Sequence, residues 1–275
     1  MRIGIMQGRL LPPQEGRFQS FPRAGWEREI ELAREAGLDC IEWIDDGYGE
    51  TVNPLWREGG VARLRELCRR SSIEVRSICA DWFMENPLLR CSAAELRARL
   101  DRLKRLIGIA AEAGIVRIVL PFVDNSRIRD EAGQDGVIRA LAEVAPVADA
   151  ARVELHMETD LAPQPFARFI ARLPEIFRVN YDSGNSSGLG YSPAEEFAAY
   201  GPRVGSVHIK DRVRGGTTVA LGTGGADFPA LFRALADCRY RGDFILQAAR
   251  GEGGAEVELA RRNRAFVERA AQVLR

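Results

Sequence analysis

Four side chains that can bind a divalent cation end four successive apolar segments in the second half of the chain. They are Glu158, Asp182, His208 and Gln247, and the chain has only two histidines. A histidine at the tip of a buried strand is a poor core residue and a good metal ligand. Three oxygens and one imidazole suit one divalent cation, with Mn²⁺ as first choice and Zn²⁺, Co²⁺ or Mg²⁺ as alternatives. The competing explanation is four unrelated polar residues that face loops.

These segments belong to a regular alternation of apolar strands and amphipathic helices. Eight strand–helix units without a linker favour a closed parallel barrel over an open sheet. We therefore expect one α/β domain over residues 1–275, a (β/α)8 TIM barrel with its chemistry at the carboxyl ends of the strands. The expected strands are residues 2–7, 40–44, 74–80, 116–121, 153–158, 177–182, 204–209 and 243–247. The expected helices are residues 26–36, 60–70, 93–113, 136–148, 163–172, 193–200, 227–237 and 256–274.

The composition is that of a soluble globular protein, with 46% hydrophobic and 28% charged residues. Lys+Arg and Asp+Glu balance at 39 each, so no overall field favours a nucleic acid or a membrane as partner. No apolar run is long enough to span a bilayer. The five cysteines are odd in number and form no CxxC pair, which indicates reduced thiols and a cytoplasmic location.

The strand-end motifs resemble those of the xylose-isomerase-like barrels. The motifs are His-Met-Glu158-Thr-Asp, Tyr-Asp182-Ser-Gly-Asn185, Val-His208-Ile-Lys-Asp211 and Phe-Ile-Leu-Gln247, with Met6-Gln-Gly-Arg-Leu10 and Ile41-Glu-Trp-Ile44 nearer the amino terminus. They are most similar to the sugar-phosphate isomerase/epimerase branch, with its L-ribulose-5-phosphate 3-epimerase-like and hexulose-6-phosphate isomerase-like members. The resemblance implies metal ligation by Glu158, Asp182 and His208, with Glu158 also the catalytic base. It also implies a small-molecule sugar or sugar phosphate as partner, and leaves open a homo-oligomer.

Two positions depart from that branch. Related epimerases carry a second glutamate where this chain has Gln247, and a histidine where it has Asn185. An amide oxygen can ligate a cation, but it cannot accept and return a proton at neutral pH. Isomerisation through an enediolate needs one base, whereas epimerisation needs a second group. Here that group would be Glu42, Asp81, Lys210 or Asp211.

Other functions remain open beside a metal-dependent ketose isomerase or epimerase. One is a sugar or inositol-type dehydratase, in which the enolate expels a hydroxyl. Another is a barrel that binds sugar without turnover, which the neutral Gln247 favours. The DNA-repair branch of the superfamily, whose trinuclear zinc site needs many histidines, is disfavoured by two histidines and zero net charge.

The expected substrate contacts lie at the same end of the barrel: Gln7, Arg9, Glu42, Asn185, Lys210 and Arg250. A phosphate group can bind just beyond strands seven and eight, near Lys210, Arg212, Arg214 and Arg250. The glycines from Gly222 to Gly225 can present backbone N–H groups to such an anion. A flexible loop with solvated arginines explains the same pattern. One layer deeper, His156, Asn180 and Ser206 share the inward face, either as support for the metal site or as a satisfied core.

Overall fold

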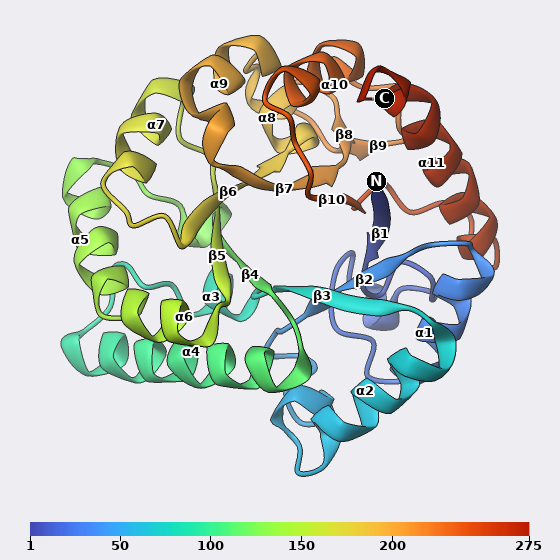
Figure 1. Ribbon diagram of the computed structural model, residues 1–275, viewed down its shortest axis with the longest axis horizontal. Coiled ribbons are helices and arrows are strands. Elements are labelled where there is room, and N and C mark those ends of the chain that lie inside the picture. Colours follow the sequence, from blue (N-terminus) through green and yellow to red (C-terminus); the bar gives the residue numbers. More distant parts are fainter. Residues whose placement is uncertain (275) are drawn as a thin grey trace.

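Eight parallel strands form a closed barrel, which confirms the (β/α)8 prediction (Figure 1). The computed structural model describes residues 1–274, so Arg275, the last residue of the expected domain, lies outside the described residues. Around the barrel the strands follow the order β1-β10-β7-β6-β5-β4-β3-β2. Their bounds are β1 Arg2–Met6, β2 Cys40–Ile44, β3 Glu74–Cys79, β4 Arg117–Phe122, β5 Glu154–Thr159, β6 Phe177–Asp182, β7 Val204–Ile209 and β10 Asp243–Leu246.

Helices surround the barrel on its outside (Figure 1). The longest begins at a capping box between Ser92 and Glu95 and ends at Gly114, whose φ of 78° favours glycine. The α-helices are α1 Trp26–Glu35, α2 Gly60–Ser71, α3 Trp82–Glu85, α4 Ala93–Ala113, α5 Glu131–Ala142, α6 Ala145–Ala151, α7 Pro163–Ala171, α8 Ser183–Leu189, α9 Pro193–Tyr200, α10 Phe228–Asp237 and α11 Glu256–Ala270. Short 3-10 turns cover Gln14–Gly16, Pro54–Trp56, Asp124–Ser126, Gly201–Arg203 and Ala271–Leu274.

One expected helix is divided in the structure. The prediction of a single helix over residues 136–148 is wrong, because α5 begins earlier and α6 follows as a separate helix. Pro146 explains the break: it has no N–H to donate to the carbonyl of Ala142, and its ring would clash with that carbonyl.

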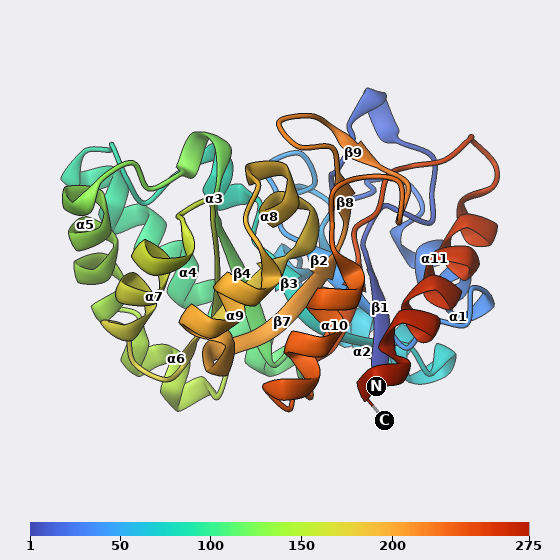
Figure 2. The same cartoon turned by 90° about the horizontal axis from the view of Figure 1, so that it is seen from above.

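Additional elements at the carboxyl ends of the strands escaped the sequence prediction. They are α3 after β3, α8 after β6, and a hairpin formed by β8 (Asp211–Arg212) and β9 (Thr218–Val219). Figure 2 shows α3, α8 and the hairpin toward one end of the barrel, with both termini at the other. These short elements therefore build the rim around the expected site.

Several inward-facing positions of the barrel carry polar side chains. Glu42, His156, Asn180, Ser206 and His208 are each at most 2% exposed. The strands β6 and β7 shift register next to Gly205, and a Cβ there would lie 2.5 Å from Cε1 of His156. Glycine is therefore needed to seat the imidazole. The apolar core lies between the barrel wall and the helices.

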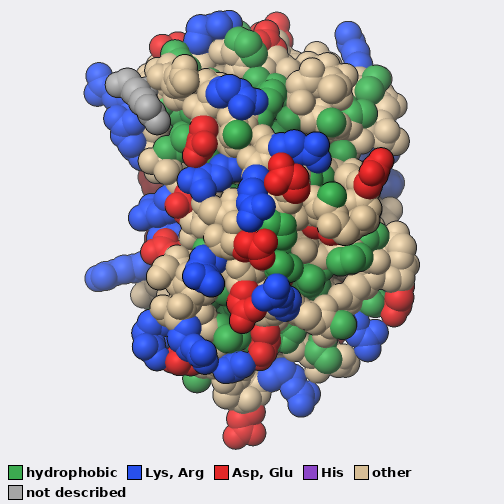
Figure 3. Space-filling view, turned by 90° about the vertical axis from the view of Figure 1, so that its right-hand side faces the viewer, with side chains coloured by type: hydrophobic (Ala, Val, Ile, Leu, Met, Phe, Trp, Pro, Cys, Tyr) green, Lys and Arg blue, Asp and Glu red, His purple; other side chains and the backbone are tan. Residues whose placement is uncertain are grey.

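Charges of both signs are interspersed on the face shown in Figure 3, in keeping with the balanced composition. All five cysteines are free thiols. Within residues 1–274 no helix has the length and apolar character needed to cross a membrane.

Candidate metal centre

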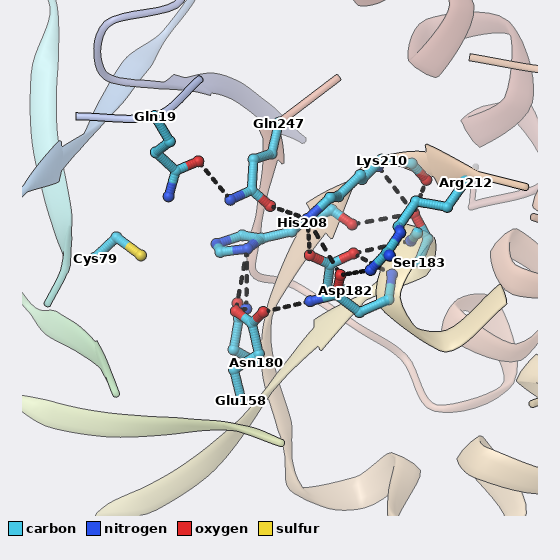
Figure 4. Close-up of polar contacts among 12 residues, drawn as sticks. Gln19, Cys79, Glu158, Asn180, Asp182, Ser183, His208, Lys210, Arg212 and Gln247 are labelled. Atoms are coloured by element: carbon cyan, nitrogen blue, oxygen red, sulfur yellow. Dashed lines mark hydrogen bonds and ion pairs between the residues drawn. The ribbon is translucent and has the colours of Figure 1, made fainter. Parts of the chain in front are cut away.

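Three of the expected ligands meet at the carboxyl ends of β5, β6 and β7. Glu158, Asp182 and His208 each offer one ligand atom, and these atoms lie within 4.8 Å of one another (Figure 4). All three side chains are buried. Two carboxylate oxygens and an imidazole nitrogen at this spacing suit a divalent cation of the Mn²⁺ or Zn²⁺ type.

The two carboxylate oxygens of Asp182 have different roles: one caps a helix and the other faces the site. Its Oδ1 accepts hydrogen bonds from the backbone N–H groups of Gly184 and Asn185, both at 2.8 Å, and so caps α8. Its Oδ2 lies 3.2 Å from Nζ of Lys210. The capping bonds fix the carboxylate, which leaves one oxygen directed at the cluster.

His208 is held from behind by Glu42. Nε2 of His208 lies 2.6 Å from Oε1 of Glu42, and both side chains are fully buried. Nδ1 faces the cluster, 3.4 Å from Oε2 of Glu158. Burial lowers the pKa of His208, but the carboxylates of Glu42, Glu158 and Asp182 outweigh it and raise that pKa to about 9. A bound cation would therefore displace a proton from Nδ1.

Glu158 is held by two amides. Its Oε1 accepts from Nδ2 of Asn185 at 2.8 Å, and its Oε2 accepts from Nδ2 of Asn180 at 2.9 Å. Burial raises the pKa of Glu158 to about 7, with the positive charge of His208 opposing that shift and Asp182 adding to it. A cation bound beside this carboxyl group would lower its pKa and favour the carboxylate form that a general base requires.

The layer beneath the cluster is hydrogen-bonded, as predicted. Nδ1 of His156 lies 2.6 Å from Oγ of Ser206, and Ser206 donates to Oδ1 of Asn180 at 2.6 Å. Nε2 of His156 lies 2.9 Å from Oε2 of Glu154. Because Oδ1 of Asn180 is occupied, its Nδ2 donates to Oε2 of Glu158. The second histidine thus supports the site through two intermediates.

The ammonium group of Lys210 lies among oxygens of the site, which shows that a positive charge is accommodated there. Its Nζ lies 3.2 Å from Oδ2 of Asp182, 3.2 Å from Oδ1 of Asn185 and 3.4 Å from Oε1 of Gln247. Oxygens from three elements therefore already face one positive charge. The carbonyl of Gln247 is among them, beside the cluster of Glu158, Asp182 and His208.

Gln19, from the long loop between β1 and α1, also reaches the site and was missed in the sequence. Its Oε1 accepts from Nε2 of Gln247 at 2.8 Å (Figure 4). No motif marks it, because its position depends on how residues 7–25 fold across the barrel mouth.

The structure does not bring Gln7, Arg9, Glu42 or Arg250 to the ligand cluster. Oε1 of Gln7 accepts from the backbone N–H of Ile44. Arg9 and Arg250 bind backbone carbonyls of the loop between β1 and α1. Glu42, expected to touch the substrate, lies behind His208. Asn185 and Lys210 do lie at the cluster.

The expected glycine-rich anion site is already occupied by a carboxylate of the chain. Oδ2 of Asp211 accepts from the N–H groups of Gly222 and Gly224, each at 2.9 Å, and Oδ1 accepts from Ala226 at 3.0 Å. Asp211 is fully buried. These N–H groups already donate to Asp211 within the same loop. The prediction that they bind a phosphate is therefore wrong.

Comparisons with known proteins agree with this fold. The putative L-ribulose-5-phosphate 3-epimerase SgbU of Escherichia coli (strain K12) is 26% identical over 240 residues, 81% of this chain and 83% of the relative. D-psicose 3-epimerase from Clostridium cellulolyticum H10, solved with D-tagatose, superposes with a TM-score of 0.76 at 16% identity, over 100% of this chain and 99% of that one. The apo form of 3-keto-D-glucoside 4-epimerase YcjR from E. coli gives a TM-score of 0.72 at 17% identity, over 98% and 99%.

The structural likenesses are too distant in sequence to show more than a shared fold. The family model described as xylose isomerase-like TIM barrel, in contrast, matches residues 30–270. That match spans most of the sequence, and the chain belongs to the xylose isomerase-like TIM barrel family.

Proposed function

We propose that this protein is a metal-dependent isomerase or epimerase that acts on a ketose or ketose phosphate through an enediolate. The observation that carries the proposal is the buried cluster of Glu158, Asp182 and His208, with Glu158 poised as a base. The names of its relatives support a ketose substrate: the SgbU protein is a putative L-ribulose-5-phosphate 3-epimerase, and the D-psicose 3-epimerase was solved with D-tagatose.

The chemistry follows from the placement of the chain's own groups. A divalent cation at Glu158, Asp182 and His208 would supply Lewis-acid polarisation of the substrate carbonyl, which acidifies the neighbouring C–H bond. Glu158 removes that proton to give the enediolate. Asn180 and Asn185 hold its carboxylate in one orientation, so the base is positioned before the substrate arrives. Nζ of Lys210 lies beside Asp182 and would donate to a substrate oxygen there.

The number of bases separates the two reactions. Isomerisation can use Glu158 alone, since the same carboxyl returns the proton to the adjacent carbon on the same face. Epimerisation needs a second group, and Glu42 and Asp211 are fully buried and engaged elsewhere. Asp81 and Lys210 remain. Burial raises the pKa of Asp81 to about 6, against hydrogen bonds from Gln19 and Cys79, which lower it.

The test is proton exchange at the substrate carbon. Protein loaded with Mn²⁺, Co²⁺, Zn²⁺ or Mg²⁺ is incubated in D₂O with ketoses and ketose phosphates, and NMR follows both C–H exchange and product. We expect exchange with at least one metal, and a loss of at least ~10²-fold in Glu158→Gln. Asp124→Asn is the matched control, because Asp124 is an exposed carboxylate beyond β4 with a φ of 49° that asparagine tolerates. Absence of exchange with every metal, or unchanged exchange in Glu158→Gln, would refute the proposal.

A further inference from the structure

A chain of three side chains links the wall formed by β3 to the metal centre. Nε2 of Gln19 donates to Oδ2 of Asp81 at 2.8 Å, and Nε2 of Gln247 donates to Oε1 of Gln19 at 2.8 Å. Oε1 of Gln247 then faces Nζ of Lys210 in the cluster. In Figure 4, Gln19 points toward Gln247 across the barrel mouth from Asp182 and Lys210.

The charges of Asp81 and Arg9 decide which group donates and which accepts in each of these side-chain hydrogen bonds. A carboxylate can only accept, so Asp81 requires the NH₂ group of Gln19. A guanidinium can only donate, and Nη2 of Arg9 lies 3.2 Å from Oε1 of Gln19. The carbonyl of Gln19 therefore faces Gln247, which must present its own NH₂ group there. The carbonyl of Gln247 is left to face the cluster.

No capping hydrogen bond occupies the carboxylate of Asp81, so it can accept from Gln19. It precedes α3 but makes no capping hydrogen bond to that helix. The groups around it are the thiol of Cys79, which donates to Oδ1 at 3.1 Å, the amide of Gln19, and the charges of Arg9, Glu42 and Asp46. With a pKa near 6, raised by burial, Asp81 is a carboxylate at neutral pH.

The loop that carries Gln19 is anchored at the preceding residue. Nη1 of Arg9 and Nε of Arg250 both donate to the carbonyl of Phe18, at 2.6 and 2.9 Å. Arg250 also binds the carbonyls of Gly8 and Leu11. Two arginines from opposite ends of the sequence thus fix where Gln19 can reach.

We infer that Gln19 is a positioning residue that turns the carbonyl oxygen of Gln247 toward the cation. A glutamate at position 247 would present an oxygen in either orientation. In the amide of Gln247 the carbonyl oxygen attracts a cation and the NH₂ group repels it. The amide must therefore be held with its oxygen toward the cation. Gln19, directed by Asp81 and Arg9, supplies that orientation. The inference rests on the metal centre of the proposed function, and its test needs no turnover.

The test measures binding of Mn²⁺ alone by calorimetry. Gln19→Met keeps the approximate shape of the side chain and removes its three hydrogen bonds, with Asp81, Arg9 and Gln247. We expect Mn²⁺ to bind about tenfold more weakly, the lower end of the effect of such supporting groups. Gln14→Met is the matched control. Gln14 lies on the same loop and pairs with both backbone groups of Ala24, away from the site.

A polarity-swapped double variant separates orientation from general loss of structure. In Gln19→Glu/Asp81→Asn the charge moves from position 81 to position 19, and an asparagine amide can donate where Asp81 accepted. Every bond direction toward Gln247 is kept, so we expect Mn²⁺ affinity within about twofold of the parent. Gln19→Glu alone sets two carboxylates together and is expected to bind Mn²⁺ less well than the double variant.

Three results would overturn the inference: unchanged affinity in Gln19→Met, an equal loss in Gln14→Met, or a double variant no better than Gln19→Met. A parent protein that binds no Mn²⁺, Co²⁺, Zn²⁺ or Mg²⁺ would instead refute the proposed function. Normal Mn²⁺ binding without proton exchange would refute the proposed reaction and leave the role of Gln19 standing.

Discussion

Replacing Glu42 with glutamine should weaken metal binding although Glu42 is not itself a ligand. Glu42 accepts the hydrogen bond from Nε2 of His208 at 2.6 Å, and neither side chain is exposed to solvent. A carboxylate in this position makes the imidazole more basic and fixes Nδ1 as the ligand atom. The amide in Glu42→Gln can still accept from Nε2, so the geometry of His208 should persist while the charge is lost.

The size of the effect follows from the kind of hydrogen bond that is lost. A bond to a charged group contributes about 1.5–3 kcal/mol and a neutral one about 1 kcal/mol, so the difference is about 0.5–2 kcal/mol. At about 1.36 kcal/mol per factor of ten, this weakens binding about 2- to 30-fold. Protons compete for the same nitrogen, because the pKa of His208 is raised to about 9. The substitution also lowers the pKa of His208, so protons compete less with the metal in the variant than in the parent. The loss in metal affinity should therefore be smaller at low pH.

The assay is a competition titration of Mn²⁺ against a chelator, under anaerobic conditions, at pH 6.5 and pH 8.5. In the parent protein the affinity should rise with pH, by up to about tenfold per unit between pH 7 and pH 9, because one proton leaves His208 on binding. Below pH 7 the rise should be steeper, because Glu158 then also loses a proton on binding. Glu29→Gln is the control, since Glu29 is equally buried but lies on α1 and accepts from the N–H of Leu10. Parent-like Mn²⁺ binding by Glu42→Gln at both pH values, or an equal loss in Glu29→Gln, would refute this role of Glu42.

Three further predictions address the reaction, the loop and stability. Gln247→Glu supplies a second carboxylate. If the variant gains 3-epimerase activity and the parent has no isomerase activity, the parent is not a one-base isomerase. Asp211→Asn should speed hydrogen exchange by at least about tenfold, either at the Ala226 amide or at the Gly222 and Gly224 amides, since only one end of the new amide can accept; unchanged exchange at all three amides would contradict this. Burial raises the pKa of Glu29 from 4.5 to about 7, so the folded protein binds more protons and loses stability as the pH rises through that window. Glu29→Gln should remove that loss of about 3 kcal/mol, measured by urea unfolding at pH 5 and pH 8, and an unchanged pH dependence would refute it.

Much of the barrel could be predicted because its strands carry a local signal. Each strand is a short apolar run bounded by polar residues, and a parallel barrel places the carboxyl ends of those runs at one rim. That geometry was enough to expect Glu158, Asp182 and His208 together. Inward parity was also enough to place His156 in the layer below.

The remaining features depend on contacts between residues distant in sequence. Glu42 and His208 are 166 positions apart, and Gln19 and Gln247 are 228 apart. The sequence indicated Glu42 as a substrate contact, but not that His208 meets it across the barrel. The glycines after Gly222 indicated a loop rich in N–H donors, but not that the buried Asp211 takes those donors.

The most direct test of the metal centre is anomalous diffraction from crystals soaked in Mn²⁺. The peak should lie between β5, β6 and β7, within about 2.0–2.6 Å of Nδ1 of His208 and of carboxylate oxygens of Glu158 and Asp182. The carbonyl oxygen of Gln247 should face the same peak, with its NH₂ group on Gln19. A peak elsewhere, or a cluster that keeps only Nζ of Lys210 at saturating Mn²⁺, would contradict the account.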